Sequence, residues 1–184
     1  SVTGQDVIKA AGGIDHWKRG QLIGRGSFGK VYAALDLNSG TQIAVKLVRF
    51  PKDVTSKKAA HEVDALRREI ELLRTLEHPN IVKYVDSFRE TASFYIVLEF
   101  VENGSLAQTI KKFGHFTETL AAMFVSQILE GLAYLHDQGV IHRDIKGANI
   151  LTATEGFVKL ADFGVAVSDT EKSNSVVGTP YWMA

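Results

Sequence analysis

A glycine-rich loop, GRGSFGKVY, runs from Gly24 to Tyr32 and is flanked by segments typical of β-strands. The segment before it is LIG, the segment after it is VYAAL, and IAVKLV follows the turn-forming LNSG at 37–40. Strand-forming residues on both sides of the glycines predict a hairpin followed by a third strand. A chain built in this way must form a β-sheet around its glycine-rich loop.

Three kinds of phosphate site use loops of this composition, and two of them do not fit. A dinucleotide-binding fold needs a helix directly after the loop and an acidic residue about 20 positions on. Val31 and Tyr32 favour a strand, and the residue 20 positions after Gly24 is Ala44. A P-loop needs Ser or Thr after Gly-Lys, where this chain has Val31. A loop that joins two strands and covers a nucleotide remains, beside a plain glycine-rich hairpin with no ligand.

The third strand has two different faces. Because side chains alternate along a strand, Ile43, Val45 and Leu47 share one face, and Ala44 and Lys46 share the other. The small Ala44 leaves room beside the lysine. Lys46 therefore points to the side of the sheet where a small residue leaves room.

The first hundred residues predict a compact α+β unit. Apolar residues recur with helical spacing in the segment 56–76, and HPN at 78–80 ends that helix. Two further runs, 81–88 and 94–100, are strand-like. The prediction is an antiparallel sheet accompanied by one helix.

Helices are predicted in the second half of the chain. Ser105 is a candidate N-cap for a short helix that ends near Gly114, and Thr117 for a long helix that ends before Gly139. Apolar residues cover more than one face of the long helix, so it is expected to be buried on most sides. Short strand-like pieces separated by charged residues follow, and charged residues in loops indicate a site.

The bulk composition excludes several classes of function. Lys and Arg number 21, as do Asp and Glu, so no general attraction to nucleic acid or anionic membranes is expected. There is no cysteine, which fits an intracellular, cytoplasmic protein. The longest apolar run, 94–101, contains Glu99 and is too short to span a membrane.

Two later motifs, with the loop and AVK at 44–46, resemble the eukaryotic protein kinase catalytic domain. HRDIKGAN occupies 142–149 and DFG occupies 162–164. The resemblance implies a bilobal α+β fold, with a complete N-lobe of five antiparallel strands and one helix, and a partial, mainly helical C-lobe. The implied division is an extension at 1–16, the N-lobe and hinge at 17–101, and the partial C-lobe at 102–184.

The resemblance implies roles for individual side chains with ATP and Mg²⁺ as cofactors. Lys46 is expected to hold the α- and β-phosphates, with Glu69 as its ion-pair partner. Asp144 is expected to accept the proton of the substrate hydroxyl, and Lys146 to neutralise the transferred phosphate, as in serine/threonine kinases. The expected metal ligands are Asn149 and Asp162. The residues expected to contact ATP are Ile23, Gly24, Arg25, Gly26, Ser27, Phe28, Gly29, Val31, Ala44, Lys46, Leu98, Glu99, Val101 and Leu151.

Regulation by phosphorylation is implied by Arg143, which directly precedes the catalytic aspartate. A phosphate on Ser173 or Ser175, added by an upstream kinase or by autophosphorylation, is expected to pair with this arginine. Thr179 is expected to be a structural hydroxyl near the catalytic residues.

The motifs HWKRGQLIGRGSFGKVY, IHRDIKGANIL and GTPYWMA resemble the MAP kinase kinase kinases, which implies a MAP kinase kinase as the protein substrate. The p21-activated and Ste20-like kinases are the alternative within the family. A nucleotide-binding but inactive scaffold, or a pure interaction module, is the alternative outside catalysis. The family pattern continues beyond Ala184, so this chain alone is expected to be poorly active.

Overall fold

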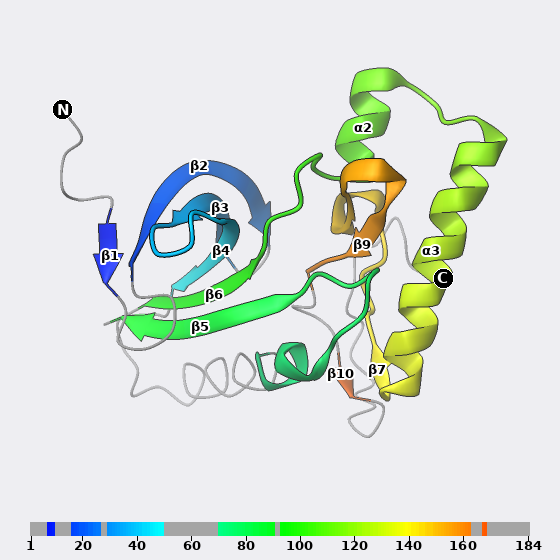
Figure 1. Ribbon diagram of the computed structural model, residues 1–184. Helices are drawn as coiled ribbons and strands as arrows, with labels where there is room; N and C mark the ends of the chain where they lie inside the picture. Colours follow the sequence, from blue (N-terminus) through cyan, green and yellow to red (C-terminus); the bar gives the residue numbers. More distant parts are fainter. Residues whose placement is uncertain are drawn as a thin grey trace. The chain divides into compact units, whose positions relative to one another are not determined.

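The computed structural model describes residues 7–9, 16–26, 29–49, 70–90, 93–162 and 167–168. The chain divides into two compact units. The first comprises Ser1–Thr75 and Lys83–Phe100, and the second comprises Leu76–Val82 and Val101–Ala184 (Figure 1).

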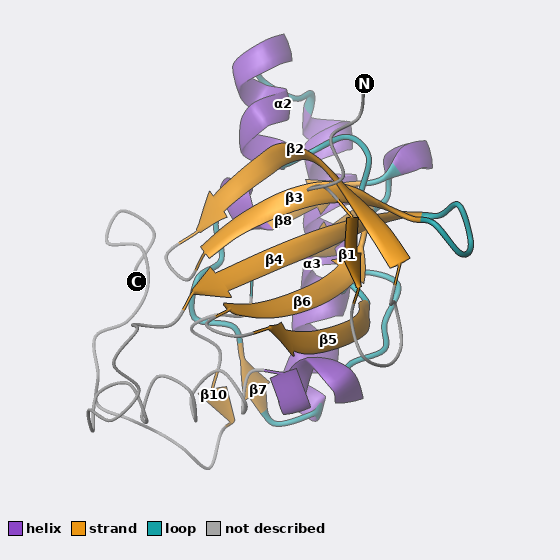
Figure 2. Ribbon diagram, turned by 90° about the vertical axis from the view of Figure 1, so that its left-hand side faces the viewer, coloured by secondary structure: helices purple, strands orange, loops and turns teal. Residues whose placement is uncertain are grey.

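Six antiparallel strands form the sheet of the first unit, in the order β1-β2-β3-β4-β6-β5. Their bounds are β1 Val7–Lys9, β2 His16–Gly26, β3 Gly29–Asp36, β4 Gln42–Arg49, β5 Tyr84–Glu90 and β6 Ser93–Glu99. Figure 2 shows these strands side by side in one sheet. The five predicted strands, β2 to β6, are confirmed. The short β1 is a sixth strand, in the segment expected to be an extension.

One face of this sheet carries the core of the first unit. Its members are aromatic or aliphatic and nearly inaccessible: Trp17, Ala34, Ile43, Val45, Leu47, Phe88, Tyr95 and Val97. The Phe88 and Tyr95 rings stack at 4.8 Å, and Trp17 packs at an angle against both. The predicted alternation along β4 is therefore confirmed, because Ile43, Val45 and Leu47 all lie on this face.

The opposite face carries Lys46. Because residues opposite one another in an antiparallel pair point to the same side, the register defines rows across the sheet. One row holds Val31, Lys46 and Ile96, and the next holds Ala44 and Leu98. All of β4 from 43 to 47 is buried, so both faces are covered.

The predicted turn between β3 and β4 is confirmed, and Asp36 organises it. The Asp36 carboxylate accepts hydrogen bonds from the Asn38 N–H at 3.0 Å and the Ser39 hydroxyl at 2.6 Å. Gly40 has a φ of 72° and donates its N–H to the Asp36 carbonyl. A residue with a side chain would be strained there.

Residues 70–75 are helical, in agreement with the end of the helix predicted at 56–76. Ile70 and Leu73, three residues apart, are 4% and 5% exposed. They form the apolar stripe that the sequence predicts for this helix. The rest of that helix, including Glu69, lies outside the described residues.

The second unit combines two helices with short paired strands. Its elements are α2 Leu106–Phe113, α3 Glu118–Asp137, β7 Val140–Ile141, the 3₁₀ turn η1 Gly147–Asn149, β8 Ile150–Thr152, the 3₁₀ turn η2 Thr154–Gly156, β9 Val158–Leu160 and β10 Val167–Ser168. β8 pairs with β9, and β7 pairs with β10, both antiparallel. Both predicted N-caps are confirmed, since Ser105 and Thr117 each accept a backbone N–H at 3.3 Å. Gln108 completes a capping box with Ser105.

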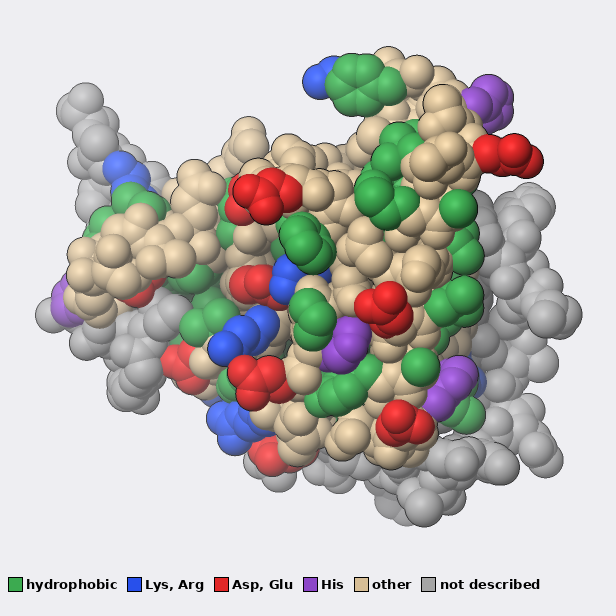
Figure 3. Space-filling model, turned by 45° about the vertical axis from the view of Figure 1, so that its right-hand side comes forward, with side chains coloured by type: hydrophobic (Ala, Val, Ile, Leu, Met, Phe, Trp, Pro, Cys, Tyr) green, Lys and Arg blue, Asp and Glu red, His purple; other side chains and the backbone are tan. Residues whose placement is uncertain are grey.

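The expectation that α3 is buried on most sides is wrong for this structure. Phe124, Gly131 and Leu135 are its buried residues, whereas Val125 and Leu129 are 51% and 58% exposed. The helix packs against β7 and β9, which leaves its other side uncovered by the described residues. Hydrophobic side chains accordingly lie at the surface in Figure 3. No helix in the described ranges is long and apolar enough to cross a membrane.

The segment 76–82 belongs to the second unit because Asn80 anchors it there. Its side-chain amide donates to Gln127 Oε1 at 3.1 Å and to the Val158 carbonyl at 2.9 Å. The Asn80 carbonyl accepts the Leu160 N–H at 2.8 Å. This buried network holds α3 and β9 together, and β9 leads directly to Asp162.

Candidate active site

The first unit carries a candidate nucleotide-binding surface, the sheet face that contains Lys46. Val31 lies opposite Lys46 on β3, and Ala44 and Leu98 form the neighbouring row. Lys46 is 6% exposed, so it is largely removed from bulk solvent. The register thus places the predicted phosphate-binding lysine and three predicted adenine contacts on one surface.

Gly24 and Gly29 of the loop have different surroundings, so a side chain would have a different effect at each position. Gly24 lies opposite Val31, and a Cβ at position 24 would lie 3.6 Å from the Val31 Cβ. Because Gly24 has no side chain, the part of the Lys46 face next to Val31 carries one group fewer. At Gly29 a Cβ would overlap the Leu47 carbonyl oxygen, so close packing against β4 requires this glycine. Ser27 and Phe28, between them, lie outside the described residues.

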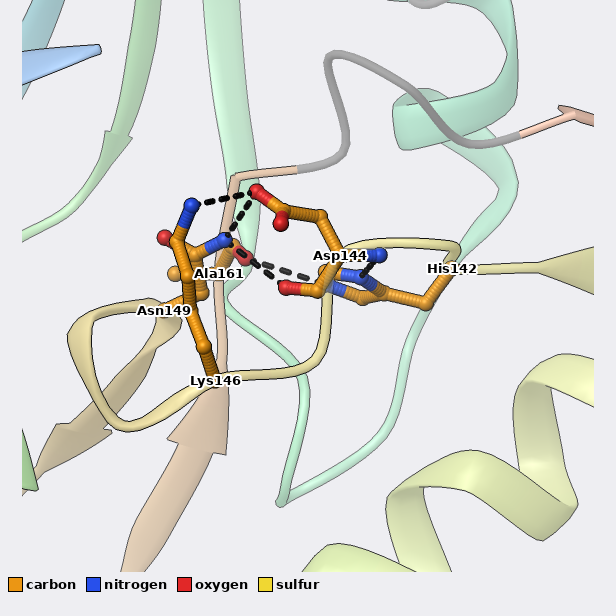
Figure 4. A network of polar contacts seen from close by, with 5 residues as sticks. All are labelled: His142, Asp144, Lys146, Asn149 and Ala161. Atoms are coloured by element: carbon orange, nitrogen blue, oxygen red, sulfur yellow. Dashed lines mark hydrogen bonds and ion pairs between the residues drawn. The ribbon is translucent and has the colours of Figure 1, made fainter. Parts of the chain in front are cut away.

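The second unit carries its own candidate site, a cluster formed by Asp144, Lys146 and Asn149 and shown in Figure 4. The Asp144 Oδ2 accepts hydrogen bonds from Lys146 Nζ at 2.8 Å and from Asn149 Nδ2 at 2.8 Å. Asn149 Nδ2 also donates to the Asp144 carbonyl oxygen at 2.9 Å. A carboxylate flanked by a cation and an amide is thus held in one orientation.

The hairpin of β8 and β9 brings Asn149 next to Asp162. Ile150 pairs with Leu160, and the Ala161 N–H donates to the Asn149 carbonyl at 2.9 Å. Asp162 is the next residue and has a φ of 62°. Positive φ in a residue with a side chain is uncommon and often marks functional sites.

Arg143 also has positive φ, at 67°. It directly precedes Asp144, so the backbone adopts the same unusual conformation near the start of the segment 142–149. Glu155, with a φ of 60°, is the third such residue among those described, and it lies in the exposed turn η2. Two of the three therefore coincide with predicted site residues.

His142 connects the segment 142–149 with the residue before Asp162 through its two ring nitrogens. Its Nδ1 accepts the Asp144 N–H at 3.3 Å, and its Nε2 lies 3.0 Å from the Ala161 carbonyl oxygen. This pattern requires a neutral ring with the proton on Nε2. Burial lowers the pKa of His142, whose side chain is 1% exposed, and the hydrogen bond to Ala161 opposes this shift.

The lowered pKa of His142 predicts a loss of stability in mild acid. The unfolded chain binds the proton near the ordinary value of 6.5, before the folded protein does. The contribution of His142 to stability is therefore fully present above that pH and is lost as the pH falls through the folded pKa. Urea unfolding measured from about pH 8 to pH 5 is expected to show this decline, and His142→Gln is expected to reduce it.

The matched control is His136→Gln, because His136 is exposed in the last turn of α3. This substitution is expected to leave the decline of the unfolding free energy between about pH 8 and pH 5 unchanged. If the unfolding free energy of His142→Gln declines with pH as steeply as that of the unsubstituted protein, His142 is not the cause of the decline.

Asn149 and Asp162 suit a hard divalent cation. Asn149 Nδ2 donates to Asp144, so its Oδ1 is the atom left to bind a metal ion. Asp162 adds a carboxylate, and oxygen donors of these two kinds are the ligands that Mg²⁺ prefers. Among the described residues, no group of three His, Asp or Glu side chains could hold a metal. Mg²⁺ is usually bound by one or two carboxylates together with phosphates and water, and oxygen donors of the Asn149 and Asp162 kind fit that chemistry.

Other predicted site residues are placed individually. The Glu99 N–H donates to the Lys83 carbonyl, and its carboxylate accepts the Lys83 N–H at 2.7 Å. Val101 is buried in the second unit. Ile23 and Leu151 are half-buried in β2 and β8, and Arg25 is exposed. Glu69, Ser173, Ser175 and Thr179 lie outside the described residues.

Ala161 is a structural link that sequence reasoning missed. Its N–H binds Asn149 and its carbonyl lies against His142. The methyl side chain takes no part in either contact. No signal in residue type could have identified it, because backbone groups do this work.

Comparison with protein families gives a match over most of the chain. The family model described as protein kinase domain matches residues 17–184. This range contains both the Lys46 face of the first unit and the Asp144 cluster of the second.

Similar proteins come from fungi and plants. The cytokinesis protein sepH of Emericella nidulans is 51% identical over 98% of this chain, and MAP3K epsilon protein kinase 1 of Arabidopsis thaliana is 54% identical over 90%. Cell division control protein 7 of Schizosaccharomyces pombe is 50% identical over 90%. The matched region is 13%, 12% and 15% of these proteins, respectively. The chain thus spans a small part of the length of its relatives.

Proposed function

This chain belongs to the protein kinase family, and we propose that it transfers the γ-phosphoryl group of ATP to a serine or threonine hydroxyl of a protein. The observation that carries the proposal is the cluster of Asp144, Lys146 and Asn149. Its hydrogen bonds of 2.8 to 2.9 Å hold the Asp144 carboxylate, the proposed proton acceptor, beside the Lys146 ammonium group and the Asn149 amide nitrogen. These are the groups that phosphoryl transfer needs.

In the proposed reaction the substrate oxygen attacks the γ-phosphorus, and the bond from that phosphorus to the β–γ bridging oxygen breaks. The hydroxyl proton passes to the Asp144 carboxylate. Lys146, which already contacts Asp144, places positive charge beside the transferred group. Most of the rate enhancement is expected from such positioning and charge.

ATP and Mg²⁺ are part of the proposal. Lys46 is the proposed partner of the α- and β-phosphates, and Val31, Ala44 and Leu98 are proposed to contact adenine because they share its sheet face. Asn149 and Asp162 are the proposed Mg²⁺ ligands. When bound, the ion neutralises negative charge on the phosphates.

The proposed substrate is a MAP kinase kinase, supported by the relative named MAP3K epsilon protein kinase 1. The names cytokinesis protein and cell division control protein favour a second candidate, a kinase that acts in cell division. The reaction is proposed to occur inside the cell, where ATP is abundant. Control by a phosphate on Ser173 or Ser175 that pairs with Arg143 remains part of the proposal.

Phosphoryl transfer to purified substrates tests the proposal. The intact protein with Mg²⁺ and ATP is expected to phosphorylate catalytically inactive MAP kinase kinases on serine or threonine, and Lys46→Met is expected to abolish the transfer. Phosphate found on tyrosine, or no transfer to any protein, would contradict the proposed activity. Transfer to other proteins but to no MAP kinase kinase would favour the second candidate.

A further inference from the structure

Arg74, in the helical segment 70–75, contacts the beginning of β5. Its Nε donates to the Tyr84 hydroxyl at 3.1 Å, and its guanidinium carbon lies 5.5 Å from the centre of the Tyr84 ring. The Tyr84 hydroxyl in turn donates to Ser87 Oγ at 2.8 Å. Arg74 Nη1 also forms an ion pair with Glu71 on its own helix, at 3.3 Å. The arginine therefore links the end of the helix to the sheet.

An irregularity in β5 brings Tyr84 and Ser87 to the same face of the sheet. Tyr84 lies opposite Leu98 and Ser87 lies opposite Ile96, with a register shift directly after Tyr84. Leu98 and Ile96 are two residues apart and share a face. The extra residue at the shift is Val85, so Tyr84 and Ser87 share that face although they are three residues apart.

This face is the one that carries Lys46. Ser87 extends the row that contains Lys46, and Tyr84 extends the row that contains Ala44. Arg74 thus links the helix to Tyr84, and through Ser87 to both rows of the Lys46 face. All of these residues belong to the first unit.

We propose that Arg74 is a positioning residue for phosphoryl transfer, acting through the Tyr84 hydroxyl to hold the helix against the Lys46 rows. The inference rests on the proposed function. The same helix is expected to carry Glu69, the proposed partner of Lys46, five residues before Arg74. Release of this helix from β5 is expected to weaken the proposed pair of Glu69 and Lys46.

Tyr84→Phe is the sharpest variant, because it removes one hydroxyl and keeps the ring that packs under Arg74. Losing these hydrogen bonds is expected to lower the population with a docked helix and so to lower kcat by about 3- to 10-fold. KM for the protein substrate is expected to stay the same, because no residue that binds it changes. Arg74→Gln is expected to act equally, and the double variant no further, because both remove one linkage.

The experiment measures steady-state kinetics and hydrogen exchange of the amides 70–75 in the intact protein. Tyr84→Phe and Arg74→Gln are expected to lower kcat and to speed this exchange, and Arg74→Lys is expected to recover part of both. The control is Tyr32→Phe, which removes the hydroxyl of a half-buried tyrosine on the opposite face of the same sheet. It is expected to change neither quantity.

Unchanged kcat in Tyr84→Phe would overturn the positioning role, whether or not exchange becomes faster. A lower kcat with unchanged exchange at 70–75 would overturn it as well, because the helix would then not be the element affected. An unsubstituted protein without transferase activity would overturn the proposed function and with it the role of Arg74. Hydrogen exchange would still report the docking contact, so the two failures are distinguishable.

Discussion

Replacing Asp144 with asparagine is expected to lower kcat by about 10²- to 10⁴-fold, the range that general base catalysis contributes. Asparagine has almost the same shape and retains an oxygen that can accept hydrogen bonds from Lys146 and Asn149. It has no carboxylate to take the substrate proton. The loss is therefore expected in kcat, whereas the affinity for Mg²⁺ and ATP is expected to stay within about 3-fold.

Single-turnover transfer and nucleotide titration, measured on the same preparation, separate these two effects. The control is Asp137→Asn, an exposed carboxylate at the end of α3, which is expected to leave both quantities unchanged. A kcat for Asp144→Asn within a few-fold of the original value would show that this carboxylate is not the proton acceptor.

Replacing Asp162 with asparagine is expected to lower Mg²⁺-dependent turnover by at least about 100-fold, because a metal-binding carboxylate is lost. Asparagine tolerates positive φ about as well as aspartate does, so the backbone at φ 62° is expected to be preserved. A loss of activity would then show that a ligand of the metal ion has been removed, and not that the backbone at position 162 has changed. Raising the Mg²⁺ concentration is expected to restore part of the turnover.

Glu155→Gln is the matched control for this variant. It removes a carboxylate at another positive-φ position, in the turn between β8 and β9, and it is expected to keep full activity at every Mg²⁺ concentration. If Asp162→Asn retains the original dependence on Mg²⁺, Asp162 is not a ligand of the ion.

Much of the first unit could be predicted because local patterns determine it. Alternation along β4 separated the core residues from Lys46, and the turn-forming LNSG at 37–40 predicted the connection between β3 and β4. The helix caps were equally predictable, since Ser105 and Thr117 each satisfy an N–H of the first turn.

Features that depend on pairing between distant segments could not be predicted. The extra residue in β5 is visible only from its register with β6, although it decides which face Tyr84 and Ser87 occupy. Burial of α3 was overestimated because apolar composition does not reveal which neighbours are present. The contact between Asn149 and the Ala161 backbone arises from the β8–β9 hairpin, which no motif encodes.

The position of the metal tests the central claim most directly. A crystal structure with Mg²⁺ and a non-hydrolysable ATP analogue is expected to show an ion about 2.1 Å from Asn149 Oδ1 and from an Asp162 carboxylate oxygen, with phosphate oxygens completing its shell. Lys46 Nζ is expected within hydrogen-bond distance of the α- or β-phosphate. An ion bound to other residues, or a triphosphate that touches neither Lys46 nor the ion, would contradict the account.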